Sequence, residues 1–263
     1  MENNELKNLP LLQGRCKLAY EWIPENTEKL LDAGCSTGYC TVHYARKSNE
    51  TYGIDIVAAQ IQEAKSNFPH INFQTSALEE IPFDDGYFDT VICTDVLEHT
   101  NDKIKSLTEL FRVLKSGGTL VLSVPHKGKY QYLDPYNYGF YMRKHLKPLY
   151  LLLYKLAWLF KGKKWPPELN PEHNIMHHHY DSDDLISMMN NAGYRDKYKI
   201  DEVYRTGLFW EALSLNIEQI FPIFRLNYKK MKFVQNIYEK SRNDYLIDYG
   251  VKAYNIALKI RKL

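Results

Sequence analysis

Residues 30–55 constrain the fold more than any other stretch, because they place a glycine-bearing turn between two apolar strands. The first strand, residues 30–33, runs into a turn that contains Gly34 and Gly38. An amphipathic stretch follows, and a second strand, residues 51–56, carries Asp55 near its end. A turn without Cβ atoms lets a ligand approach the backbone closely, and a carboxylate roughly 20 residues further on can accept from both hydroxyls of a ribose. The pattern therefore predicts a βαβ unit that binds a nucleoside.

The spacing of the glycines separates one class of nucleoside site from another. Dinucleotide-binding proteins use G-x-G-x-x-G, which points a helix N-terminus at a pyrophosphate. Here the turn reads Gly34-x-x-x-Gly38, and no third glycine follows at that spacing. The stretch instead resembles the first motif of the class I S-adenosylmethionine-dependent methyltransferases, D/E-x-G-x-G-x-G. Asp32 stands at the start of this motif and Ser36 at the position of its middle glycine.

Three later segments resemble the same family, and in particular its ubiquinone- and menaquinone-biosynthesis branch. Residues 76–93 are similar to that branch's acidic segment and the buried strand after it, residues 94–99 to the segment after its fourth strand, and residues 110–120 to its helix, glycine turn and fifth strand. The similarity covers residues 28–126, with every motif in the family's order. It implies an α/β fold with a Rossmann-like, seven-stranded, mostly parallel sheet, and S-adenosylmethionine as the cofactor.

The hydrophobic pattern agrees with this fold. The apolar runs at 91–93 and 120–124 are continuous, as expected of parallel strands that are covered on both faces. Gly117 and Gly118 predict a tight turn from a helix into the fifth strand. Ligands of open α/β sheets bind beyond the carboxyl ends of the strands, so the segments that follow the strands should line the site.

Carried over position by position, the resemblance implies a role for each of these segments. The first motif would hold the methionine end of the cofactor, Asp55 would bind the ribose hydroxyls, and Ile56 would pack against the adenine. Leu78 would offer its backbone near the edge of the ring. A structural alternative for Asp55 is that it caps the next helix. The implied cofactor-binding residues are Asp32, Gly34, Cys35, Ser36, Gly38, Asp55, Ile56, Ala77, Leu78, Thr94 and Asp95.

The composition is that of a globular protein. Hydrophobic residues make up 44% of the chain and charged residues 25%, both ordinary values. No run reaches the roughly 18 apolar residues that a spanning helix needs, and residues 1–10 lack the apolar core of a signal peptide. The cysteines (Cys16, Cys35, Cys40 and Cys93) have no C-x-x-C spacing. We therefore expect them to be reduced, apolar core residues of a cytoplasmic protein.

Charge is distributed unevenly along the chain. Residues 1–126 and 166–224 have formal net charges of −7 and −6, whereas residues 127–165 and 225–263 have +8 and +7. A basic insert and a basic tail on an acidic body indicate an anionic partner. Lysines that only keep the chain soluble are the alternative explanation.

The segment after the fifth strand is rich in tyrosine, tryptophan and lysine. Class I methyltransferases usually place substrate-recognition additions here. We therefore predict one methyltransferase domain, residues 1–263, with a helical substrate or lid insert at 127–179. Within the insert, residues 149–160 are apolar and have basic flanks, which is typical of a segment that lies on an anionic membrane. A buried lid helix and a dimer contact are the alternatives.

Two histidines are candidates for the base that a hydroxyl acceptor requires. His126 ends the fifth strand, and His178 lies in the histidine run 177–179. Consecutive side chains point in different directions, and no matching acid or cysteine spacing accompanies the run, so we predict no metal site.

The Ser-Val-Pro-His end of the fifth strand, followed by residues 132–137 and later by His-Tyr before the next helix, resembles methyltransferases found with glycan-assembly enzymes. This resemblance implies O-methylation of a sugar or a lipid-linked glycan. We expect a cytoplasmic protein, with residues 149–160 as its contact if it lies on the cytoplasmic face of a membrane. A small-molecule or quinone-type methyltransferase would share the core, and a non-catalytic protein would bind the cofactor without transferring its methyl group. We do not expect a nucleic acid as the acceptor, because the Asn-Pro-Pro-Tyr type motif used for base amines is absent at residues 94–97.

Overall fold

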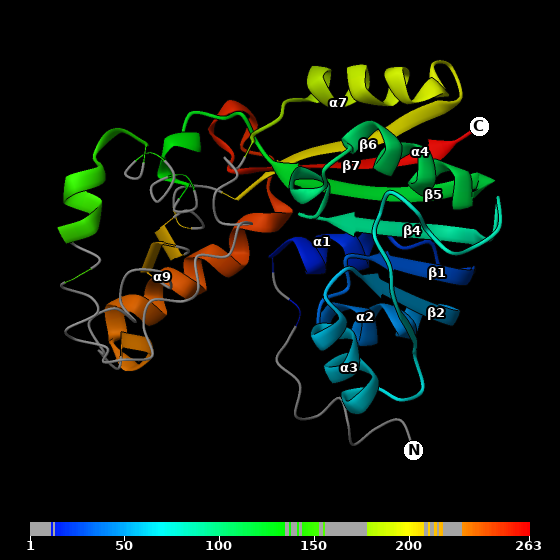
Figure 1. The fold of residues 1–263 in the computed structure, drawn as a ribbon, viewed down its shortest axis with the longest axis horizontal. Helices are drawn as coiled ribbons and strands as arrows, with labels where there is room; N and C mark the ends of the chain where they lie inside the picture. The colour runs from blue at the N-terminus through cyan, green and yellow to red at the C-terminus, as the bar shows by residue number, and fades with distance from the viewer. Residues whose placement is uncertain are drawn as a thin grey trace. The chain divides into compact units, whose positions relative to one another are not determined.

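The computed structural model describes residues 12, 14–134, 137, 141, 144–152, 155, 178–207, 210, 213, 214, 216, 217 and 228–263 (Figure 1). The chain divides into two compact units. The first comprises Met1–Ser123, Ser187–Val203 and Leu258–Leu263, and the second comprises Val124–Ile186 and Tyr204–Ala257. Every residue of the predicted cofactor site belongs to the first unit, and the predicted insert, residues 127–179, belongs to the second. The organisation as one domain with an insert stays a prediction.

Seven strands form one sheet in the order β3-β2-β1-β4-β5-β7-β6. The pairs β1–β2, β1–β4, β2–β3 and β4–β5 are all parallel. The strands are β1 (Thr27–Ala33), β2 (Ser48–Asp55), β3 (Asn72–Thr75), β4 (Phe88–Thr94), β5 (Leu114–Pro125), β6 (Tyr198–Thr206) and β7 (Asn255–Lys262). The prediction of a Rossmann-like, mostly parallel seven-stranded sheet is therefore confirmed.

Helices connect the strands. They are α1 (Gly14–Trp22), α2 (Tyr39–Tyr44), α3 (Ala58–Asn67), α4 (Lys103–Val113), α7 (Ser182–Met189) and α9 (Lys232–Asn243). Short helical turns lie at Ala45–Lys47, Leu97–His99, Gln131–Leu133, Asn190–Tyr194, Tyr228–Lys230, Asp244–Leu246 and Gly250–Lys252. Figure 1 shows α2 and α3 beside β1 and β2. In the chain, α2 lies between β1 and β2, and α3 lies between β2 and β3.

The centre of the sheet is buried on both faces, as the continuous apolar runs predicted. In β1, Leu30 and Leu31 are fully buried, and Val91 and Ile92 of the neighbouring β4 are fully buried as well. Leu31 is paired with Val91 across the two strands. Because successive side chains of a strand point to opposite faces, two adjacent buried residues require cover on both sides.

The start of β5 differs from the sequence-based expectation. We expected Gly117 and Gly118 to form a turn before the strand, yet β5 already begins at Leu114. Phe88 is paired with Leu114, whereas Thr90, two residues later, is paired with Thr119. The extra residues on β5 form an irregularity in which Gly117 has a φ of +81°, a conformation that glycine adopts without steric cost. The glycines thus bend the strand and do not precede it.

Candidate functional site

The turn after β1 is held against the end of β2 by its own backbone. The amides of Gly34 and Cys35 both donate to the carbonyl of Ile54, at 2.7 and 2.9 Å. Gly34 has a φ of +92°, and a Cβ at this position would collide with the side chain of Val96. Gly38 has a φ of +78° and is the N-cap of α2. Both predicted glycines therefore have backbone conformations that residues with a Cβ rarely adopt.

Ser36 shows why the missing middle glycine does not disrupt this turn. Its φ is +50°, in the left-handed region that small polar residues tolerate better than bulky ones. Its amide donates to Oδ2 of Asp55 at 2.9 Å. The turn after β1 and the end of β2 are thereby tied together at the predicted ribose position.

Asp55 ends β2 and is held from two directions. Besides Ser36, the amide of Val57 donates to its Oδ1 at 2.9 Å. The N-cap residue of α3 is Val57 itself, so the alternative prediction that Asp55 is the N-cap is wrong. Each carboxylate oxygen has a second lone pair that is free to accept a further hydrogen bond. Two oxygens fixed in this way suit a pair of vicinal hydroxyls.

The residues beside Asp55 are unusually apolar for a surface. The side chain of Ile56 is 65% exposed and that of Val57 is 39% exposed. Burial of such side chains is favourable by roughly 1.5–3 kcal/mol each when a ligand covers them completely. A carboxylate next to an open aliphatic surface matches the ribose and adenine of the cofactor that the sequence implies, so the residues present fit it. Ala77 and Leu78 follow β3, and the contacts predicted for them remain predictions.

Asp32 lies under the turn and not on its surface. It is only 4% exposed, and Thr41 of α2 donates to its Oδ2 at 2.6 Å. Burial raises the pKa of Asp32 to about 7, and the hydrogen bond from Thr41 opposes this increase. The side chain therefore fixes α2 to β1, and its charge depends on pH near neutrality.

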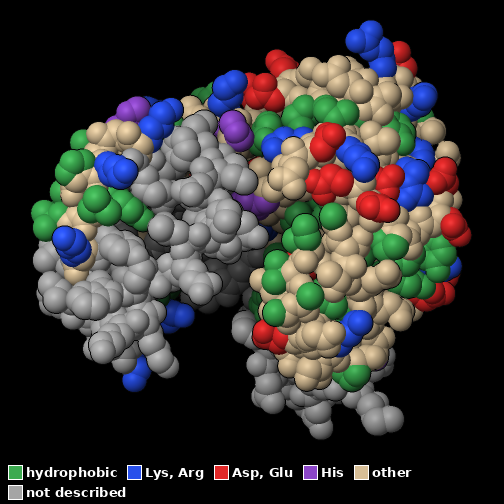
Figure 2. Space-filling model, viewed as in Figure 1, with side chains coloured by type: hydrophobic (Ala, Val, Ile, Leu, Met, Phe, Trp, Pro, Cys, Tyr) green, Lys and Arg blue, Asp and Glu red, His purple; other side chains and the backbone are tan. Residues whose placement is uncertain are grey.

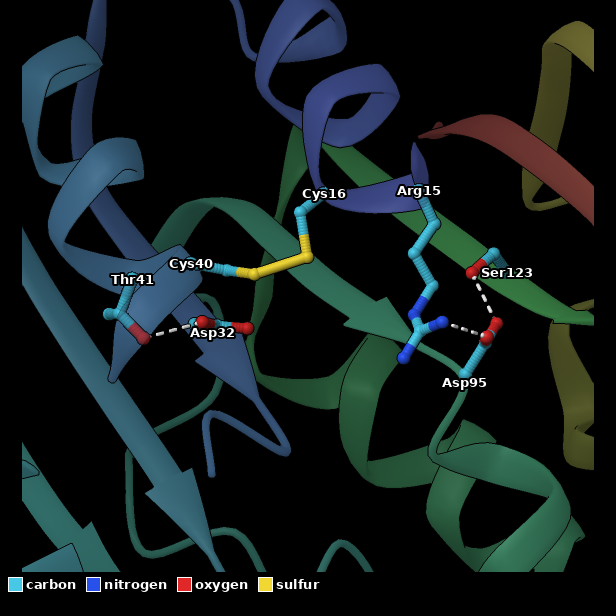
Figure 3. The surroundings of a disulfide bond; sticks show 7 residues. All are labelled: Arg15, Cys16, Asp32, Cys40, Thr41, Asp95 and Ser123. Atoms are coloured by element: carbon cyan, nitrogen blue, oxygen red, sulfur yellow. Dashed lines mark hydrogen bonds and ion pairs between the residues drawn. A yellow bond between two sulfur atoms is a disulfide. The ribbon is translucent and has the colours of Figure 1, made fainter. Parts of the chain in front are cut away.

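Asp95 follows β4 and is the second non-glycine residue of the site with a positive φ, +53°. Its Oδ1 accepts a hydrogen bond from the hydroxyl of Ser123 at 2.9 Å. Its Oδ2 lies 2.8 Å from the guanidinium of Arg15 in α1, as Figure 3 shows. Backbone strain of this kind persists where several contacts enforce it, which is common at ligand sites. Thr94, also predicted to contact the cofactor, ends β4 directly before it.

A disulfide between Cys16 and Cys40 corrects the expectation that all four cysteines are reduced. It joins α1 to the first turn of α2, with Cα atoms 6.0 Å apart (Figure 3). The expectation holds for Cys35 and Cys93, which are free and buried. Burial raises the pKa of both thiols. The sequence carried no signal for the pairing, since 24 residues separate Cys16 from Cys40 and the first of them precedes every motif.

The predicted bases lie in the second unit and differ in their surroundings. His126 is 4% exposed, and its Nδ1 lies 3.3 Å from the carbonyl oxygen of Ala253. Burial lowers the pKa of His126, so the ring is neutral at pH 7. His178 is exposed. Its neighbour His179 belongs to the same histidine run, and its Nε2 lies 3.3 Å from Oδ2 of the fully buried Asp134.

Within the described ranges, no group of three or more histidine, cysteine or acidic residues is arranged to hold a metal ion. Two histidines of the predicted region, His173 and His177, lie outside the described residues. So does most of the aromatic insert, including Tyr154, Trp158 and Trp165.

Comparison with known proteins shows that the part of the chain that contains the site is similar to methyltransferases. Residues 31–122 match the sequence family described as "Methyltransferase domain". The chain is 31% identical over 98 residues to a Mycolicibacterium smegmatis protein named "Probable S-adenosylmethionine-dependent methyltransferase", covering 37% of this chain and 38% of that protein. It is 30% identical over 125 residues to the demethylmenaquinone methyltransferase of Beutenbergia cavernae, covering 46% and 50%. The matches thus span half or less of the length of these relatives.

The fold also resembles solved structures over nearly the whole chain. A structure of an S-adenosylmethionine-dependent methyltransferase from Methanosarcina mazei superposes with a TM-score of 0.53 at 18% identity. The alignment covers 94% of this chain and 97% of that structure. At this identity the likeness concerns the arrangement of strands and helices alone.

Proposed function

We propose that this chain transfers a methyl group from S-adenosylmethionine to an acceptor hydroxyl, because residues 31–122 match the family described as "Methyltransferase domain". The observation that carries the proposal is the carboxylate of Asp55, which the amides of Ser36 and Val57 hold at the end of β2. A fixed carboxylate beside an exposed aliphatic surface suits an adenosine, because the carboxylate can accept from both ribose hydroxyls.

The cofactor, when bound, supplies a methyl group on a sulfonium, which is already a good leaving group. The main task of the protein is then to align the acceptor with the methyl group and to exclude water. Gly34 and Gly38 give the turn beside the methionine end its left-handed backbone conformation, with φ values of +92° and +78°. Asp55 fixes the nucleoside, and Arg15 and Asp95 define the neighbouring wall at the end of β4.

The transfer to a hydroxyl also needs a base, and we infer that His179 fills this role. A carboxylate close to a histidine ring stabilises the imidazolium that forms when the ring accepts a proton. Asp134 lies in this position, 3.3 Å from Nε2 of His179, and both side chains are buried. His126 and His178, the candidates from the sequence, remain alternatives without an acidic partner of this kind among the interactions described for them.

Replacement of each histidine by Gln separates the three candidates. Loss of a general base typically lowers the rate 10²- to 10⁴-fold, while the affinity for S-adenosylmethionine should not change. We expect this result for His179→Gln and a rate within about threefold of wild type for His126→Gln and His178→Gln. A His179→Gln chain with full activity would assign the base elsewhere.

For the acceptor, we propose a sugar hydroxyl of a glycan, either free or lipid-linked. The support is the Ser-Val-Pro-His segment at the end of β5 and the aromatic composition of residues 127–165, since aromatic faces suit the apolar faces of sugars. A quinone-type acceptor is the second candidate, because the relatives include a demethylmenaquinone methyltransferase. The test is transfer of radiolabelled methyl groups to lipid-linked saccharides, free glycans and quinone precursors in parallel. Labelling of quinone precursors alone would reject the sugar.

A peripheral contact with an anionic membrane fits a lipid-linked acceptor. Leu146, Leu149, Leu151 and Leu152 are all about half exposed, and the exposed residues Lys144, Lys147 and Lys155 lie in the same segment. Figure 2 shows hydrophobic and basic side chains side by side where Figure 1 draws this segment in green. Apolar side chains among lysines favour the surface of an anionic bilayer. No helix among the described residues is long and apolar enough to cross a membrane.

Vesicle flotation tests this contact. The chain should float with vesicles that contain phosphatidylserine and should float less with neutral vesicles or in high salt. Replacement of Leu149 and Leu152 by Ser should abolish flotation at unchanged activity towards a soluble acceptor. The same two replacements would instead convert a dimer to a monomer if this surface joins two copies of the chain, and that outcome would contradict the membrane contact.

A further inference from the structure

Two adjacent residues of helix α1, Arg15 and Cys16, link it to the rest of the first unit. Cys16 is bonded to Cys40 in the first turn of α2. Arg15 forms a 2.8 Å ion pair with Asp95, which follows β4. Figure 3 shows the two side chains leaving α1 in different directions, towards α2 and towards the end of β4. The helix therefore bridges the segments that follow two neighbouring strands.

These two strands flank the point at which ligands bind in this kind of sheet. In the order β3-β2-β1-β4-β5, the chain continues from β1 to one side and from β4 to the other. Open α/β sheets bind their ligands in the crevice at such a switch point, outside the carboxyl ends of the strands. Both contacts of α1 lie at these ends, because Cys40 follows the turn after β1 and Asp95 follows β4. Through these two contacts α1 lies next to the cofactor turn.

The ion pair and the disulfide differ in strength. The side chain of Arg15 is 40% exposed, and ion pairs that water and salt can reach contribute little to stability. Leu18, Ala19 and Trp22 anchor the end of α1 that is further from Arg15, where they are buried. Among the described residues, the disulfide is the only covalent bond that a side chain of α1 forms. Whether the start of α1 stays in place therefore depends mainly on this bond.

We propose that the disulfide between Cys16 and Cys40 is a redox-controlled latch that holds α1 over the cofactor turn and slows the exchange of S-adenosylmethionine. The inference rests on the proposed function. A dithiol opens the latch: one of its thiolates attacks a sulfur of the disulfide, and its second thiolate resolves the mixed disulfide. Two cysteine thiols result, and the dithiol becomes a cyclic disulfide, so that two electrons and two protons pass to the protein. A small-molecule disulfide reverses the reaction and leaves as two thiols.

The remaining cysteines do not compete in this exchange. Cys35 and Cys93 are buried, and the thiolate, which is the reactive form, is disfavoured there because burial raises the pKa of both thiols. A response of the folded protein to a mild reductant therefore reports on Cys16 and Cys40. The chain has four cysteines, so alkylation after denaturation should label two in the oxidised protein and four in the reduced protein.

The test is the rate at which radiolabelled S-adenosylmethionine leaves the full chain after dilution into an excess of unlabelled cofactor. We expect reduced wild type to release the label about tenfold faster than oxidised wild type, equivalent to about 1.4 kcal/mol. Cys16→Ser should release it at the reduced rate with or without reductant. Arg15→Gln should add a further increase in the reduced protein, because it removes the ion pair.

Three outcomes would overturn the latch. These are equal release rates from oxidised and reduced wild type, a redox response that persists in Cys16→Ser, and four alkylated cysteines in the oxidised protein. The wild-type comparison alone decides the question if Cys16→Ser does not fold. Equal release rates with intact methyl transfer would remove only the latch, whereas absence of cofactor binding in both redox states would remove the proposed function as well.

Discussion

Replacement of Asp55 by Ala should weaken the binding of S-adenosylmethionine and leave the fold intact. The carboxylate ends β2 and accepts hydrogen bonds from the amides of Ser36 and Val57, both at 2.9 Å. In the proposed complex it also accepts from the ribose hydroxyls. Asp55→Ala removes the acceptor of the two amides and of the ribose hydroxyls, so it affects both the stability of the fold and the affinity for the cofactor.

The cost to binding is the larger of the two. Hydrogen bonds to a charged group contribute about 1–3 kcal/mol in total, which corresponds to a roughly 5- to 150-fold increase in Kd. The cost to folding is smaller, because the side chains of Ser36 and Val57 are exposed and water can replace the carboxylate at their amides. We expect the free energy of unfolding to fall by about 1 kcal/mol or less.

Isothermal titration calorimetry with S-adenosylmethionine and urea denaturation of the apo protein measure the two costs. Asp89→Ala is the matched control, because Asp89 also accepts from a backbone amide, that of Lys29 at 2.9 Å, but near the start of β4. It should lower stability without changing the Kd for the cofactor. An unchanged Kd in Asp55→Ala, or an equal change in both variants, would refute the role of Asp55 as the ribose ligand.

Three further predictions concern the same unit. Gly34→Ala should lower the free energy of unfolding by about 2–4 kcal/mol, because the new alanine has a φ of +92° and its Cβ collides with Val96. In urea denaturation, adding Val96→Ala to this variant should recover part of the lost stability. No recovery would argue against the collision. Burial raises the pKa of Asp32 from 3.8 to about 7, so the folded protein retains a proton that the unfolded chain loses. Stability of the apo protein should therefore decrease as pH rises from about 4 to about 7, by up to about 1.4 kcal/mol per pH unit, and this contribution should vanish in Asp32→Asn; identical pH profiles of the two proteins would contradict it. Cys16 and Cys40 are 24 residues apart. Reduction of their disulfide should lower the free energy of unfolding by about 3.5 kcal/mol in the chain-entropy description. Superimposable denaturation curves with and without reductant would show that the bond does not constrain the unfolded chain.

The sheet and the turn after β1 were predictable because their signals are local. Continuous apolar runs identified β4 and β5, and the glycines at 34 and 38 marked the turn, where the structure shows positive φ values at both. The position of Asp55 at the end of β2 could be predicted because a strand has a definite end and parallel strands present their ends at one edge. Each inference used residues that are close in sequence and a rule that holds for all sheets of this kind.

The features that escaped prediction are contacts between distant residues. Nothing near Cys16 or Arg15 indicates that α1 reaches the ends of β1 and β4, because the helix precedes every motif. The contact between Asp134 and His179 escaped prediction for the same reason. The two residues are 45 positions apart, and no sequence pattern links them. The start of β5 at Leu114 was missed for a different reason: glycines usually end elements, and only the pairing with β4 shows that this strand continues through them.

The central claim is that the turn after β1 and the carboxylate of Asp55 form a site for S-adenosylmethionine. Calorimetric titration of the wild-type chain with S-adenosylmethionine, and in parallel with NAD, tests it most directly. We expect one molecule of S-adenosylmethionine to bind per chain, with no measurable binding of NAD. A titration without heat from S-adenosylmethionine, or tighter binding of NAD, would contradict the account.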